Sequence, residues 1–366
     1  MILADQGADV IKVESPDGDI LRRIGPGRGG MSGYYATLNR GKRSIVLDLQ
    51  LEAAQQAMYR LLGDADVFLH NLRVGAADRL GMGAGELRAR FPMLVYASIN
   101  GFGSTTPRAE DAAYDQIIQA LSGIAARQAT KDGTPSLIRH GVVDKVTGYT
   151  MAQAITAALL RRTHTGHGEV IELAMLDSAV AFLWMDAMAS YTCLDEDATT
   201  YNDLAGAFQL TSTRDGHVSL NAITDRQFQG LMEAVGLEFD DELRTVEGRG
   251  RLGGKAMREV KKRLGELTTS EVVDRMQAFG VPCGRVVGLP NLRESPEIVD
   301  NSIIREIDHP IVGRMVHPRP APRMAGVDDV TPRPAAALGE HTDEILAEAG
   351  FSAAEIAELR SAGAAA

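Results

Sequence analysis

One aspartate is the residue best placed for chemistry in this sequence. Asp144 lies in the run His140-Gly-Val-Val-Asp144-Lys-Val-Thr-Gly148, and apolar residues at spacings of three and four after it predict an amphipathic helix that ends at Gly166. We place Asp144 at the N-cap of this helix or just before it. Free backbone N–H groups and the helix dipole favour an ionised carboxylate there by about 0.3–1 kcal/mol. By position alone Asp144 is most often a cap, although a carboxylate can also attack an activated acyl group.

The segments around this helix predict an α/β fold. In the first 165 residues, short β-branched runs such as Val10–Glu14, Ser44–Asp48 and Leu94–Ile99 alternate with helical patterns such as Leu51–Leu62. This alternation predicts a Rossmann-like large domain with a mainly parallel sheet that helices cover on both faces. Ligands of such sheets bind beyond the carboxyl ends of the strands. We assign residues 1–189 to the first part of this domain.

The middle of the chain has a different pattern. Residues 208–221 predict a hairpin, with Asp215-Gly216 as its turn, and polar helices follow. We predict a smaller α+β domain over residues 190–310, with a surface loop over residues 247–254. A proline-rich segment, extended rather than helical, precedes a last helix in residues 311–366.

Composition excludes several classes of protein. The 366 residues are 45% hydrophobic and 24% charged, as in an ordinary globular protein. The net charge of −11 gives no basic footprint for nucleic acid or for anionic lipid. Cys193 and Cys283 fit no zinc or redox spacing, so we expect no metal, no disulfide framework and a reducing, cytoplasmic location. The longest apolar stretch contains Asp177 and Asp186, which argues against a membrane span.

A set of short motifs then points to one family. They run in order along most of the chain: Leu3–Glu14, Pro16–Asp19, Asn39–Asp48, Ala65–Gly75, Asp78–Gly81, Tyr114–Gly123, Thr165–Gly168, Gly280–Gly284, His309-Pro310 and Leu338–Thr342. Together they resemble the class III CoA-transferases, a family that includes formyl-CoA and carnitine CoA-transferases and is related to α-methylacyl-CoA racemase.

The resemblance implies roles for individual residues. Asp144 matches the catalytic nucleophile of the family, and Tyr114 and Asp115 match its active-site neighbours. Asn71, Leu72 and Arg79 match residues that contact the CoA nucleotide, while Lys12 and Arg43 are weaker candidates. The resemblance also implies that the C-terminal segment returns to the large domain and that two chains form an interlocked homodimer.

The implied reaction is the transfer of CoA from an acyl-CoA donor to a carboxylic acid acceptor. It would proceed through a covalent aspartyl intermediate, with CoA and acyl-CoA as substrates and no permanently bound cofactor. An acyl-CoA racemase of the same fold is one alternative, but related racemases carry histidine where this chain has Tyr114. Tyrosine, with a pKa of about 10, is a poor second base. A catalytically silent binding subunit is another alternative, against which Asp144 argues.

The start of the sequence carries a further expectation. Relatives have about two dozen residues before the motif that opens here at Met1, and these usually form the first strand of the sheet. We therefore expect Val10–Glu14 to lack one neighbouring strand. We also expect the true start of the protein to lie upstream of Met1.

Overall fold

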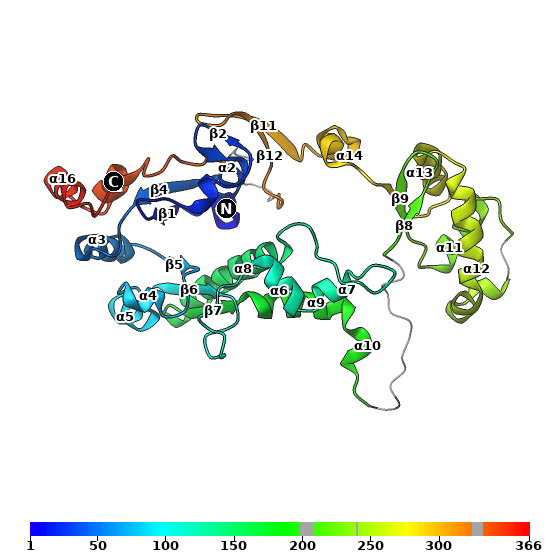
Figure 1. The fold of residues 1–366 in the computed structure, drawn as a ribbon, viewed down its shortest axis with the longest axis horizontal. Helices are drawn as coiled ribbons and strands as arrows, with labels where there is room; N and C mark the ends of the chain where they lie inside the picture. Colours follow the sequence, from blue (N-terminus) through cyan, green and yellow to red (C-terminus); the bar gives the residue numbers. More distant parts are fainter. Residues whose placement is uncertain (196, 198–207, 239–240, 324–331) are drawn as a thin grey trace. The chain divides into compact units, whose positions relative to one another are not determined.

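The computed structural model describes residues 1–195, 197, 208–238, 241–323 and 332–366 (Figure 1). These residues form two compact units. Unit 1 comprises Met1–Met188 and Ser302–Ala366, and unit 2 comprises Ala189–Asn301. The last 65 residues of the chain therefore belong to the same unit as the first 188.

Unit 1 contains the parallel strands. Its elements in chain order are α1 (Ile2–Asp5), β1 (Val10–Glu14), η1 (Ile20–Arg22), β2 (Gly27–Arg28), β3 (Met31–Ser32), α2 (Gly33–Leu38), β4 (Lys42–Val46), α3 (Glu52–Gly63), β5 (Val67–His70), α4 (Ala76–Arg79), α5 (Ala84–Arg90), β6 (Val95–Asn100), α6 (Asp115–Leu121), α7 (Ile124–Arg127), α8 (Val142–Thr165), β7 (Val170–Ala174), α9 (Met175–Ala187), β11 (Ile304–His309), β12 (Gly313–Pro318), α15 (Thr342–Glu348) and α16 (Ala353–Ser361).

The parallel strands form two sheets rather than one. Strand β1 pairs with β4, while β5, β6 and β7 pair in that order, all in parallel. In the described part of the chain no backbone ladder joins β1 to β5. The prediction of an α/β fold with parallel strands is confirmed. The prediction of a single sheet is not, because sequence patterns identify strands without identifying their partners.

Apolar burial explains why the two ends of unit 1 lie together. The largest core cluster contains Ile45 of β4, Leu62 of α3, and Ile345 and Leu346 of α15. Three of these side chains are completely buried, and each such burial stabilises the fold by about 1.5–3 kcal/mol. The chain also closes on itself by backbone pairing, since Leu47 forms a bridge with Ala365.

Unit 2 is an α+β unit with its own core. It contains α10 (Ala189–Thr192), β8 (Leu210–Ser212), β9 (His217–Leu220), α11 (Asp225–Ala234), η3 (Asp241–Arg244), α12 (Val246–Gly265), α13 (Thr269–Ala278), β10 (Cys283–Arg285), η4 (Leu289–Glu294) and α14 (Pro296–Asp300). The predicted hairpin is confirmed as β8–β9, to which β10 adds antiparallel. Helices α11, α12 and α13 pack around Val218 and Val260, both completely buried.

Two sequence-based assignments are corrected. Residues 247–254, predicted as a surface loop because of their glycines, lie inside α12, which Thr245 caps through its side chain. Residues 302–310, assigned to the small domain, belong to unit 1. The reason is the antiparallel β11–β12 hairpin, which contributes Ile311 and Met315 to a core cluster around Tyr35.

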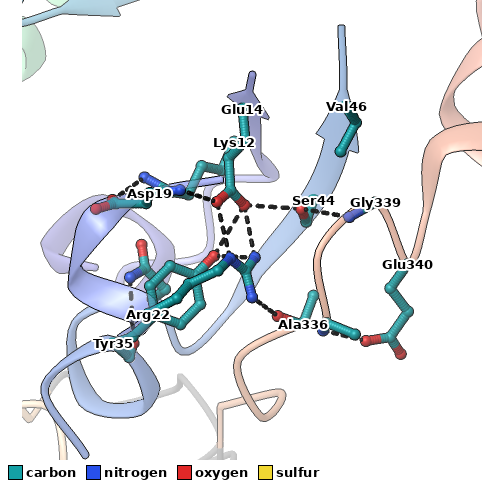
Figure 2. A network of polar contacts seen from close by, with 12 residues as sticks. Lys12, Glu14, Asp19, Arg22, Tyr35, Ser44, Val46, Ala336, Gly339 and Glu340 are labelled. Atoms are coloured by element: carbon teal, nitrogen blue, oxygen red, sulfur yellow. Dashed lines mark hydrogen bonds and ion pairs between the residues drawn. The ribbon is translucent and has the colours of Figure 1, made fainter. Parts of the chain in front are cut away.

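A buried ion pair stabilises the N-terminal part of unit 1 (Figure 2). Arg22 binds Glu14 through two nitrogens, at 2.6 and 2.9 Å, and its third nitrogen donates to the carbonyl of Ala336. Tyr35 and Ser44 donate their hydroxyl protons to the same carboxylate. Burial of Glu14 opposes ionisation, but the hydrogen bonds from Arg22, Asp19 and Ser44 outweigh it and lower the pKa of Glu14 from 4.5 to about 2. The C-terminal segment therefore contacts two residues that bind this charged carboxylate, since Ala336 accepts from Arg22 and Gly339 donates to Ser44.

We predict that Glu14→Gln destabilises unit 1 by on the order of 3 kcal/mol, because Arg22 is left buried without its counter-charge. Because the pKa of Glu14 is lowered, its contribution to stability depends on pH. The contribution is complete above pH 4.5 and is lost as the pH falls towards 2. Urea unfolding of wild type and variant between these pH values measures both effects.

The matched control is Glu86→Gln, which removes an exposed ion pair with Arg90. Its expected cost is below about 1 kcal/mol. Equal effects of the two substitutions would contradict the role given to Glu14.

Candidate active site

The N-termini of two helices meet at the candidate site. Helix α6 begins at Asp115, directly after Tyr114, and α8 begins at Val142, after a glycine that offers no capping side chain. The carboxylate of Asp115 supplies that cap from a distance, because its Oδ2 accepts the backbone N–H of Asp144 at 3.0 Å. Asp115 thus fixes the first turn of α8 and, with it, the position of Asp144.

A buried glutamine holds Asp115 in place. The side-chain nitrogen of Gln119 donates to Oδ1 of Asp115 at 2.5 Å and to the carbonyl of Ile138 at 3.1 Å. Its side-chain oxygen accepts the backbone N–H of Ile138 at 2.9 Å. The amide therefore joins α6 to the segment that leads into α8.

The position of Asp144 corrects the sequence-based expectation. Asp144 is the third residue of α8 rather than its N-cap, and its carboxylate accepts no hydrogen bond among the described residues. Loss of solvent around the carboxyl group raises its pKa above the ordinary value, repulsion from Asp115 raises it further, and Lys145 partly opposes both. The expected helix-end effect would have lowered it. A carboxylate without hydrogen-bond donors is the more basic and the more available to attack a carbon atom.

The two carboxylates face a common point at Gly141. A methyl group added to Gly141 would lie 3.4 Å from Oδ2 of Asp115 and 3.4 Å from Oδ2 of Asp144. A methyl group at this position would therefore make ordinary van der Waals contact with both acids.

The two acids lie at a cavity of about 350 Å³. Its wall is formed by Asn71, Ala113, Tyr114, Asp115, Asp144, Thr147 and Met175. The volume is at the lower end of the range for small-molecule sites. The structure thus brings together four of the six residues that the sequence singled out.

The loop after β5 brings Asn71 to the cavity. The Nδ1 atom of His70, at the end of β5, accepts a hydrogen bond from the backbone N–H of Leu72. The Nε2 atom of the same ring lies 2.7 Å from the hydroxyl oxygen of Tyr96. Burial lowers the pKa of His70, which keeps the ring neutral and able to accept at Nδ1. His70 therefore shapes the loop that carries Asn71.

The remaining sequence-based candidates lie apart from the cavity wall. Leu72 and Arg79 are exposed, and Arg79 on α4 makes no ion pair with any described residue. The weaker candidates are occupied in internal pairs: Lys12 binds Asp19, and Arg43 binds three carboxylates.

Four residues at the site were not singled out from the sequence: Ala113, Gln119, Thr147 and Met175. Gln119 lies one turn after Asp115, and Thr147 one turn after Asp144, so helical spacing could have placed both beside the acids. Ala113 and Met175 carried no such signal. Met175 is the first residue of α9, directly after β7, and the fold brings it to the cavity wall.

Two features are absent from the described residues. In them no group of three or more His, Cys, Asp or Glu side chains could hold a metal ion. None of their helices combines the length and the apolar character needed to cross a membrane.

Comparison with known proteins agrees with the motifs. The sequence model of CoA-transferase family III matches residues 1–342. The chain belongs to that family. It is a class III CoA-transferase, an enzyme that acts on acyl-CoA and carboxylate substrates, as the resemblance predicted.

Among the relatives of this class III CoA-transferase, the human succinyl-CoA:glutarate CoA-transferase is 32% identical over 99% of this chain and 85% of its own length. The acetyl-CoA:oxalate CoA-transferase of Acetobacter aceti is also 32% identical, over 92% and 87% of the two chains. A crystal structure of Rv3272 from Mycobacterium tuberculosis matches with a TM-score of 0.81 and 29% identity, covering 93% and 92% of the two chains. A CAIB/BAIF family protein from Brucella suis has a TM-score of 0.79 and 31% identity, covering 95% and 93%.

The repulsion between Asp115 and Asp144 predicts how substitutions shift the pKa of Asp144. Asp115→Asn removes a like charge while keeping an oxygen for the helix, so the pKa of Asp144 should fall towards the ordinary range. Lys145→Gln removes the one charge that lowers it, so the same pKa should rise. Carbon-13 NMR of the aspartate carboxyl groups measures both shifts. Shifts of the same sign in the two variants would contradict this electrostatic account.

Proposed function

We propose that this class III CoA-transferase moves CoA between two carboxylic acids through a covalent intermediate on Asp144. The observation that supports the proposal is the geometry of this residue. Its carboxylate lies in a cavity wall, accepts no hydrogen bond among the described residues and has a raised pKa. Each of these properties favours attack on a thioester carbon.

The steps balance without oxidation or reduction. An oxygen of Asp144 attacks the donor thioester, the carbon–sulfur bond breaks, and a mixed anhydride and CoA thiolate are formed. The thiolate then attacks the aspartyl carbonyl and releases the donor acid, which leaves an aspartyl-CoA thioester. The acceptor carboxylate attacks this thioester and releases the thiolate again. Attack of the thiolate on the acceptor acyl carbon frees Asp144.

Other residues receive roles by their place in the site. Asp115 positions Asp144 through the helix, and the cavity wall at Asn71 and Met175 surrounds the acyl end of the donor. The exposed Arg79, free of a counter-ion among the described residues, is suited to a CoA phosphate. We propose Asn71, Leu72 and Arg79 as CoA contacts. The acids named for the relatives, succinate, glutarate and oxalate, are the first acceptors to test.

We predict that Asp144→Asn abolishes turnover, because the neutral amide is a poor nucleophile. Incubation of wild type with acyl-CoA followed by hydroxylamine should mark the peptide that contains Asp144, as read by mass spectrometry. The control is Asp274→Asn on α13 of unit 2, an exposed site that should leave turnover unchanged.

The same reactions in deuterated water address the racemase alternative. We expect no rapid deuterium incorporation at the α-carbon, since Tyr114 stands at the position of the second base. Turnover in Asp144→Asn close to that of wild type would overturn the covalent mechanism. Rapid exchange that depends on Asp144 and occurs without CoA transfer would establish racemisation instead.

We also propose that two chains form the interlocked homodimer that the resemblance implies. Helix α9 exposes Phe182, Trp184 and Met185, with 46%, 46% and 79% of their surfaces accessible. Large aromatic and methionine side chains exposed together are typical of interfaces. Light scattering should give about twice the chain mass of 39.2 kDa. Trp184→Ser combined with Met185→Ser should weaken the dimer, and a monomeric wild type would contradict the proposal.

A further inference from the structure

The buried row of helix α8 contains one side chain that packing does not explain. Positions 143, 147, 151 and 155 follow one another at four-residue spacing and are all buried. Three of them are apolar: Val143, Met151 and Ile155. The fourth is Thr147, with only 2% of its surface accessible.

The hydroxyl of Thr147 has no hydrogen-bond partner among the described residues. Two other threonines of the same helix show the usual arrangement, because Thr150 donates to the carbonyl of Val146 and Thr156 to that of Ala152, each at 2.9 Å. A buried hydroxyl without a partner costs about 1–3 kcal/mol. Valine has nearly the same shape and would avoid this cost. Packing alone therefore does not explain the hydroxyl at this position.

The location of Thr147 suggests that role. Thr147 lies three residues after Asp144, so the two side chains are neighbours on one helix face, and both belong to the wall of the same cavity. The hydroxyl oxygen is closed to water in the free protein. Threonine in a helix has two accessible side-chain rotamers, however, and no hydrogen bond holds this one. Rotation about the Cα–Cβ bond turns the hydroxyl without moving the backbone.

We propose that the Thr147 hydroxyl donates a hydrogen bond to the acyl carbonyl oxygen that the carboxylate of Asp144 attacks. Negative charge gathers on this oxygen as the new carbon–oxygen bond forms, and a hydrogen-bond donor in the wall of the cavity stabilises it. The hydroxyl keeps its proton, and no bond to Thr147 forms or breaks. This assignment rests on the proposed function, since it requires an acyl group at Asp144.

Two substitutions separate this role from packing. Thr147→Val keeps the shape and removes the donor, whereas Thr147→Ser keeps the donor. We expect Thr147→Val to slow acylation of Asp144 by about 10²–10³-fold, the loss typical of one missing oxyanion donor. We expect Thr147→Ser to remain within a few-fold of wild type. The melting temperature of Thr147→Val should be equal to that of wild type or higher, because the unpartnered hydroxyl is gone.

The matched control is Thr150→Val. It removes a hydroxyl that has a partner and lies outside the cavity wall, so it should lower the melting temperature slightly and leave acylation unchanged. Single-turnover mass spectrometry of the peptide that carries Asp144, with succinyl-CoA as donor, measures the rate in every variant.

The outcomes distinguish the two proposals. Wild-type acylation in Thr147→Val, with Asp144→Asn inactive, overturns the role of Thr147 alone. Turnover in Asp144→Asn overturns the covalent mechanism itself. A lower melting temperature and equally slow acylation in Thr147→Val and Thr147→Ser would show a packing role and also overturn the assignment.

Discussion

The hydrogen bond from the backbone N–H of Asp144 to the carboxylate of Asp115 organises the site. It joins the first turns of α6 and α8 through two residues that are 29 positions apart in sequence, and it replaces the cap that Gly141 cannot supply. The same carboxylate raises the pKa of Asp144 by repulsion. One side chain therefore fixes the position of the candidate nucleophile and adjusts its basicity.

The glycine at position 141 and the helix cap supplied by Asp115 complement each other. A serine or aspartate at position 141 would cap α8 locally, as most helices are capped. It would also place atoms at the point that the two carboxylates face, where even a methyl group would touch both at 3.4 Å. With the cap transferred to Asp115, the position beside the two carboxylates carries no side chain, and Gln119 maintains the geometry of the cap.

Much of the fold could be predicted from local sequence patterns. The hairpin β8–β9 and the end of α8 at Gly166 follow from turn residues and apolar spacing, and the structure agrees. Strand pairing could not be predicted in this way, because β1 and β5 look alike in sequence and differ only in their partners. The helix at residues 247–254 was missed because its glycines lower helix propensity, while packing of the rest of α12 around Val260 and Leu264 compensates.

The candidate site was likewise predictable only in part from the sequence. Asp144, Tyr114 and Asp115 were found through motifs, and the cavity brings all three together. The environment of Asp144 was predicted with the wrong sign, because the helix-end argument considers only the helix that carries the carboxylate. The opposing effects, solvent loss and a second acid, come from α6 and the cavity. Whether a helix N-terminus lowers a pKa therefore depends on what the neighbouring elements place beside it.

The polar residues of α8 show how one helix can serve both stability and chemistry. Thr150 and Thr156 satisfy their hydroxyls within the helix, and such residues are neutral to the fold. Thr147, one turn after Asp144 near the start of the same helix, leaves its buried hydroxyl without a partner among the described residues, whereas Asp144 is exposed to solvent. A buried hydroxyl without a partner lowers stability, so the wall of this cavity is one place where the protein gives up stability. In the proposed complex the acyl carbonyl oxygen would accept from the Thr147 hydroxyl, which would couple substrate binding to satisfaction of this one buried group.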